Sequence, residues 1–181
     1  MLCITVPPIE KWDEQKEEFV VVEKAQQLCM EHSLVSLSKW ESKWCKPFLS
    51  TKDKSTEEIL DYIKCMTINR DPNDRVFDRL SRANVEQITD YIKAPMTATR
   101  FSQDRNAKTN KEVITSELIY YWMVALNIPF ECQKWHINRL LTLIRVCNIK
   151  NQPPKKMSKR DIMSRNAALN AARRQQLNTR G

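Results

Sequence analysis

The sequence predicts a mainly α-helical body of about six helices, with a small N-terminal β-hairpin and a basic C-terminal arm. Beyond Ser33, apolar residues recur at i, i+3 and i+4, which is the spacing of one face of an α-helix. Residues 55–58 (Ser-Thr-Glu-Glu) form a capping-box motif, which marks a helix start. Residues 2–6 and 19–22 are short apolar runs rich in β-branched side chains, which favour strands.

The N-terminal region has a proline pair and a charged stretch between its two strand-like runs. Pro7 and Pro8 are followed by residues 10–18, which include most of the charges of this region. We therefore expect a hairpin in which a long loop joins the two runs. Residues 27–31 are a candidate third strand.

The expected helices in the first half of the chain have recognisable start and stop signals. The first follows Ser33 and ends before Pro47, and the second opens at Ser55. A short helix is expected after Asp71 and Pro72. The apolar faces of these three helices contain Leu34, Leu37, Trp40, Trp44, Ile59, Tyr62, Ile63, Met66, Val76, Phe77 and Leu80.

A further helix is expected over residues 85–93, with Asn84 as its cap and Pro95 as its stop. Residues 99–111 are polar and charged, which predicts an exposed loop.

The two most hydrophobic helices are expected over residues 117–127 and 131–146, with Thr115 or Ser116 capping the first. A short turn at Pro129 would join them into an αα-hairpin at the centre of the core. The predicted core residues are Leu60, Ile63, Phe77, Leu118, Trp122, Leu126, Trp135, Leu140, Leu141 and Ile144.

The net charge of +8 is confined to the end of the chain. Residues 150–181 hold nine Lys or Arg and one acidic residue, whereas residues 1–149 hold 21 basic and 21 acidic residues. The last 32 residues also contain no Phe, Trp or Tyr. We therefore expect a neutral globular body over residues 1–149, with the hairpin region in residues 1–31 and helices in residues 33–149. Residues 150–181 would form a basic arm, partly helical or disordered, that attracts polyanions or acidic protein surfaces.

Composition argues against several classes of function. The chain contains one glycine, its last residue, so it lacks the glycine-built loops of nucleotide-binding sites and nucleophile elbows in their standard forms. No run approaches the roughly 18 apolar residues of a membrane span. Residues 1–6 contain neither a basic leader nor a long apolar stretch, so we do not expect secretion. Six scattered cysteines without a Cys-x-x-Cys motif favour free thiols in a reducing cytoplasm.

Two Cys–His pairs offer a metal-binding or catalytic alternative. Cys29 and His32, with Cys132 and His136, would supply the ligand set of a structural zinc site. About 100 residues separate the pairs, and buried cysteines acting as small apolar side chains are the favoured interpretation. Cys–His catalysis with either histidine as base lacks a recognisable oxyanion hole. We therefore expect no catalytic residue, no metal and no cofactor.

Aromatic rings and cations are the candidate partner-binding residues. Trp40 and Trp44 lie one helical turn apart; they could form an exposed ledge, although a buried face is favoured for tryptophan. Residues 120–122 (Tyr-Tyr-Trp) point in three directions around a helix, so at least one ring should face outward. The arm could hold nucleic acid non-specifically, dock onto a protein, or only add solubility. The candidates are Trp40, Trp44, Tyr121, Lys155, Lys156, Arg160, Arg173 and Arg174.

Several stretches of the sequence resemble a phage protein family. They are residues 32–44 (HSLVSLSKWESKW), 95–99 (PMTAT), 119–123 (IYYWM), 128–131 (IPFE), 135–144 (WHINRLLTLI) and 153–158 (PPKKMS). Together they are similar to the tail assembly chaperones of long-tailed, siphovirus-type bacteriophages. The likeness spans roughly residues 31–181, and the Trp-Glu-Ser-Lys-Trp stretch is its most distinctive part.

The resemblance implies a non-enzymatic protein that acts in the host cell cytoplasm and is absent from the mature virion. Such chaperones coat the helical tape-measure protein and keep it soluble while tail-tube subunits polymerise around it. Many have a longer form made by ribosomal frameshifting, here expected near Lys155 and Lys156. Two alternatives stay open: a phage nucleic-acid-associated protein that uses the basic arm, and a virion structural protein such as a head–tail connector. No membrane partner is expected.

Overall fold

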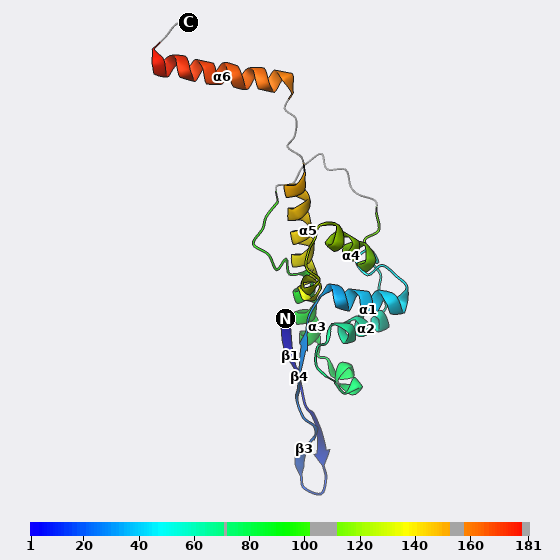
Figure 1. The fold of residues 1–181 in the computed structure, drawn as a ribbon. Coiled ribbons are helices and arrows are strands. Elements are labelled where there is room, and N and C mark those ends of the chain that lie inside the picture. The colour runs from blue at the N-terminus through cyan, green and yellow to red at the C-terminus, as the bar shows by residue number, and fades with distance from the viewer. Residues whose placement is uncertain (71, 102–111, 153–157, 179–181) are drawn as a thin grey trace. The chain divides into compact units, whose positions relative to one another are not determined.

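The computed structural model describes residues 1–70, 72–101, 112–152 and 158–178. Over these residues it contains six α-helices, two short 3-10 helices and four short strands (Figure 1), so the prediction of a mainly helical protein is confirmed. The chain divides into two compact units, Met1–Asn148 and Ile149–Gly181, which are described separately. None of the helices in the described ranges is long and apolar enough to cross a membrane.

The N-terminal strands form two successive antiparallel pairs. Strand β1 (Leu2–Val6) pairs with β4 (Gln26–Met30), and β2 (Ile9–Asp13) pairs with β3 (Glu18–Glu23). The expected pairing of residues 2–6 with residues 19–22 is therefore wrong, whereas the candidate third strand is present as β4. The charged stretch contains a strand because only residues 14–17 are needed for the turn.

The β1–β4 pair carries the buried face of the ribbon. Ile4, Val6, Leu28 and Met30 alternate with exposed or half-buried residues along the two strands and are at most 3% exposed. Cys3 lies directly opposite Cys29 in this ladder, and the two form a disulfide. The expectation that all cysteines are free thiols is therefore corrected for this pair.

Helices α1 (Leu34–Trp44), α2 (Thr56–Met66) and α3 (Arg82–Lys93) each begin with a capping box. The caps at Ser33 and Ser55 lie where the sequence indicates. The cap of α3 is Ser81 and not Asn84, whose side chain instead accepts the Ser81 backbone N–H at 3.1 Å. Between α2 and α3, η1 (Asp74–Arg79) is a 3-10 helix.

The last helices of the first unit differ from the two helices expected over residues 117–127 and 131–146. Helix α4 (Ser116–Ala125) is capped by Thr115, and η2 (Phe130–Lys134) precedes α5 (Ile137–Asn151). The expected single helix over residues 131–146 is therefore wrong. It is interrupted because the Ile137 N–H donates to the His32 carbonyl at 2.7 Å and His136 bridges to Ser33, which draws this backbone into an extended segment.

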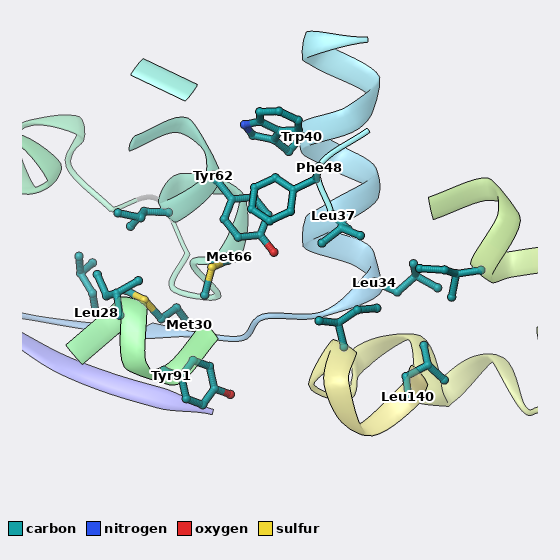
Figure 2. Close-up of a cluster of buried hydrophobic side chains, with 14 of the residues drawn as sticks. Leu28, Met30, Leu34, Leu37, Trp40, Phe48, Tyr62, Met66, Tyr91 and Leu140 are labelled. Atoms are coloured by element: carbon teal, nitrogen blue, oxygen red, sulfur yellow. The ribbon is translucent and has the colours of Figure 1, made fainter. Parts of the chain in front are cut away.

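The core is centred on α1 and α2 and on their contacts with the strands (Figure 2). Phe48 stacks on Tyr62 with ring centroids 3.8 Å apart, and Trp40 meets Phe48 edge-on at 5.0 Å. The expected αα-hairpin at the centre is therefore wrong: α1 packs against both α2 and α4 and occupies that place.

Of the ten predicted core residues, all but Leu60 and Leu118 are part of the core or pack against it. Ile63, Phe77, Leu140 and Ile144 are buried. The half-buried ones are Leu60, Leu118, Trp122, Leu126, Trp135 and Leu141.

The second unit contains helix α6 (Lys159–Leu177), which Ser158 caps by accepting the Asp161 N–H at 3.1 Å. No residue of α6 is buried. The expected helical content of the arm is therefore present, and every side chain of this helix faces solvent. Most of the predicted exposed loop at residues 99–111, and the proline pair at residues 153–154, lie outside the described residues.

Candidate partner-binding surfaces

Trp40 is buried and does not present a binding surface. Its ring is 0% exposed, and its indole N–H donates to the Glu58 carbonyl at 2.8 Å. Burial removes a large apolar area from water, and the hydrogen bond satisfies the one polar atom of the ring. The candidate role of Trp40 in direct partner contact is therefore corrected: it is a core residue that positions α1 on α2.

Trp44 is half-buried at the edge of a shallow cavity of about 370 Å³ between α1, α2 and η1. Its indole N–H donates to Asp61 Oδ2 at 2.9 Å, and Lys43 pairs with Oδ1 of the same carboxylate. The hydrogen bond to Asp61 raises the pKa of Lys43. Trp44 also stacks on Trp40, with centroids 6.2 Å apart. The ring is therefore fixed in orientation, and part of one face is left for a partner.

Tyr121 lies on an exposed apolar patch of α4. Tyr121 and Val124, three residues apart on one helix face, are 65% and 59% exposed. Phe130 of η2 is 54% exposed, and its ring lies 6.5 Å from that of Tyr120. We call Tyr121, Val124 and Phe130 the α4 patch. The sequence indicated Tyr121 alone, although the i, i+3 spacing would also have found Val124.

A second apolar surface, missed from the sequence, is a groove of about 190 Å³ between α2 and α3. Ile59 and Val85 line it and are 44% and 38% exposed, although Ile59 was expected on the inward apolar face of its helix. Lys54 and Lys93 also line the groove. The Lys54 ammonium lies 4.4 Å from the centroid of the Phe48 ring, and burial lowers its pKa.

The structure brings the two histidines together but not the two Cys–His pairs. The rings of His32 and His136 are 5.0 Å apart. Cys29 is bonded to Cys3, so its sulfur is not available as a thiolate ligand in this state. Cys132 is buried and free. Within the described ranges, no group of three or more His, Cys, Asp or Glu side chains is placed to hold a metal ion.

Both histidines are built into the hydrogen-bond network of the core. His32 Nδ1 lies 2.5 Å from the Tyr62 hydroxyl. His136 donates from Nε2 to the Tyr91 carbonyl at 3.0 Å and accepts the Asn138 N–H on Nδ1 at 3.3 Å. Burial, aided by the neighbouring His136, lowers the pKa of His32 to about 3, and burial also lowers the pKa of His136. Both rings are therefore neutral near pH 7.

The cationic candidates of the arm that lie within the described residues are exposed. Arg160, Arg173 and Arg174 lie on α6 and face solvent. Lys155 and Lys156 lie outside the described residues.

Comparisons of this chain with protein-family models, with curated proteins and with solved structures found no match. The functional assignment therefore depends on the residues and surfaces described above.

Proposed function

We propose that this protein is a bacteriophage tail assembly chaperone that binds the tape-measure protein without catalysing a reaction. The proposal starts from the resemblance of residues 31–181 to that family, above all in the Trp-Glu-Ser-Lys-Trp stretch, and the observation that supports it is the exposed apolar surface of α4. In this proposal the protein acts in the host cytoplasm while tail-tube subunits polymerise around the tape-measure protein. It leaves before the virion is complete, and a longer frameshifted form accompanies it.

The exposed apolar surfaces support a role in holding another polypeptide. A chaperone of this type must cover apolar segments of a client that would otherwise aggregate. The α4 patch offers an exposed aromatic ring beside an aliphatic side chain, the kind of residue that dominates binding energy at protein interfaces. The groove between α2 and α3 offers a second apolar contact with lysines at its edge. We assign the α4 patch as the main client contact.

Co-expression with the tape-measure protein encoded in the same phage genome tests this proposal. We expect the tape-measure protein to be soluble with this chain, insoluble without it, and captured with it on affinity resin. Tyr121→Glu combined with Val124→Glu should weaken binding by about tenfold or more, because two charges then replace apolar contact area. The measurements are the soluble fraction of the tape-measure protein and the amount captured.

Ala83→Glu with Gln87→Glu is the matched control, because both residues are exposed on α3, one turn apart and away from both apolar surfaces. This pair should bind as the native chain does. An insoluble tape-measure protein in the presence of the native chain would refute the chaperone proposal. If the α4-patch variant and the control variant lost the same amount of tape-measure binding, only the assignment of the α4 patch as the client contact would be refuted.

The exposed basic helix favours nucleic acid as the second candidate partner. Helix α6 holds five basic residues and one acidic residue. Phosphate contacts of this kind weaken steeply with salt. DNA binding that persists at physiological salt would favour this alternative, whereas binding confined to low salt would be incidental. Mass spectrometry of purified particles tests the third candidate, a head–tail connector, which would be present in the virion.

A further inference from the structure

The β2–β3 hairpin carries an apolar face that is exposed among the residues the structure describes. The register places Trp12 opposite Phe19 and Glu10 opposite Val21, so the three apolar side chains share one face. Trp12, Phe19 and Val21 are 53%, 67% and 48% exposed, and the two aromatic rings contact each other edge-on at 5.1 Å. An isolated two-stranded hairpin is marginally stable in water. This face therefore gains free energy from any surface that covers it.

The same hairpin has an excess of acidic side chains. Residues 9–23 contain six carboxylates and two lysines, a net charge of −4. Glu23, at the base, pairs with Arg79 at 3.4 Å, and Arg79 also donates to the Pro7 carbonyl. Among the described residues, the five carboxylates nearer the tip form no ion pair with a basic side chain. These five are Glu10, Asp13, Glu14, Glu17 and Glu18.

Helix α6 has the opposite character. Residues 159–177 contain five basic residues and one acidic residue, a net charge of +4. Ile162, Leu169 and Leu177 follow at intervals of seven and eight residues, which places them along one helix face, with Arg173 between them. All three are exposed, at 44%, 46% and 71%. Because most helical stability in proteins comes from packing of an apolar face, α6 also gains stability from a surface that covers it.

We propose that the β2–β3 hairpin of one copy binds helix α6 of a second copy. The apolar face of α6 covers Trp12 and Phe19, and its arginines reach the carboxylates around the hairpin tip. The two segments carry net charges of equal size and opposite sign and come from the same chain, which favours a second copy over a foreign partner. Reciprocal exchange makes two identical contacts and closes a twofold dimer. This inference is independent of the proposed chaperone function.

Exchange of charge between the two segments tests the proposal. The first variant reverses the net charge of α6. It carries Arg160→Glu, Arg173→Glu and Arg174→Glu, which change the charge from +4 to −2. The second variant reverses the net charge of the hairpin. It carries Glu10→Lys, Glu14→Lys and Glu18→Lys, which change the charge from −4 to +2. Each variant alone then has two segments of like charge. An equimolar mixture restores opposite charges at both contacts.

Sedimentation equilibrium of the full-length chain at physiological salt gives the readout. We expect the native chain to dimerise, each variant alone to dimerise at least tenfold more weakly, and the mixture to form heterodimers. Lys52→Glu with Arg70→Glu and Arg100→Glu, three exposed positions outside both segments, is the control of equal charge change and should dimerise as the native chain does. Far-UV circular dichroism checks that all variants are folded.

Three outcomes would overturn the proposal. A monomeric native chain would mean that the segments stay apart or close within one molecule. If either variant alone dimerised with the affinity of the native chain, the dimer interface would lie outside these two segments. A mixture that stays monomeric would show that the two segments do not recognise each other.

Discussion

Glu41 is a buried carboxylate that joins three parts of the fold. It is 7% exposed, and it accepts the Phe48 N–H on Oε1 at 2.8 Å and the Ser116 N–H on Oε2 at 2.7 Å. It thus connects α1 to the segment that follows it and to the first turn of α4. An anion at a helix N-terminus is also favoured by the helix dipole. Glu41 belongs to the Trp-Glu-Ser-Lys-Trp stretch.

Removal of the Glu41 carboxylate should destabilise the protein strongly. Glu41→Ala leaves two buried N–H groups without acceptors, so we expect a loss of roughly 2–4 kcal/mol in the free energy of unfolding. Glu41→Gln retains one acceptor and should lose less. Urea denaturation measures both. Glu86→Ala, which removes an exposed pair with Arg82, is the control and should change stability by at most about 0.5 kcal/mol. A loss for Glu41→Ala no larger than the control would contradict the structural role.

His32 gives the fold a dependence on pH. Its pKa is about 3 in the folded protein, against 6.5 for an unperturbed histidine. Below pH 6.5 the unfolded chain therefore binds a proton that the folded chain does not, and stability falls as the pH is lowered. From pH 8 to pH 5 we expect His32 to account for a loss of about 2 kcal/mol in the free energy of unfolding.

Denaturation curves of the native chain and of His32→Gln at several pH values measure this contribution. The variant should be less sensitive to pH over this range, whatever its stability at pH 8, because glutamine does not titrate. If the difference in stability between the two chains were constant from pH 8 to pH 5, His32 would not be the group responsible. The range stops at pH 5 because carboxylates titrate below it.

At the scale of elements, the disulfide between Cys3 and Cys29 contributes to the stability of the β1–β4 pair. Cys3 and Cys29 are 26 residues apart in the sequence and opposite each other in the ladder. A crosslink of this span restricts the unfolded chain. The proposed cytoplasmic location is reducing, so this pair would be open there and closed once exposed to oxidant.

Thiol titration of the oxidised protein should find four free cysteines, Cys45, Cys65, Cys132 and Cys147. Reduction should then lower the free energy of unfolding by about 3 kcal/mol. Cys3→Ser should be insensitive to reductant, whereas Cys45→Ser, which removes an exposed free thiol, should respond as the native chain does. Six titratable thiols after mild oxidation would mean that the pair does not form.

At the scale of the whole molecule, the two units differ in what stabilises them. The first has a core built from strands and helices that are distant in sequence, whereas α6 buries no residue. Local hydrogen bonds and the cap at Ser158 are therefore the main support of α6.

Amide hydrogen exchange should separate the two units. In dilute monomeric protein, we expect the amides of α6 to exchange within about tenfold of the rates of an unfolded peptide, because a helix that buries none of its residues opens often. Those of α1 should exchange orders of magnitude more slowly. Mass spectrometry of peptic fragments measures both in one sample. If the amides of α6 were as strongly protected from exchange as those of α1 in the dilute monomer, α6 would not be the helix without buried residues described above.

The sequence by itself determined the local features of this protein. It predicted the helix that begins at Ser55, because a capping box is formed by residues three apart and needs no distant partner. It predicted the helix that follows Ser33 because apolar residues recur there at helical spacing. It also located Tyr121 as an outward ring and the cations of α6, since helical spacing and charge are properties of short segments.

Only the tertiary structure decided the pairing of β1 with β4, the break before α5 and the partner of the Trp40 indole N–H. Each depends on residues far apart in the sequence: Cys29 opposite Cys3, the His32 carbonyl bonded to the Ile137 N–H, and the Glu58 carbonyl bonded to Trp40. Local periodicity carries no information about such contacts, because the free energy that selects them comes from burial and hydrogen bonding across the core.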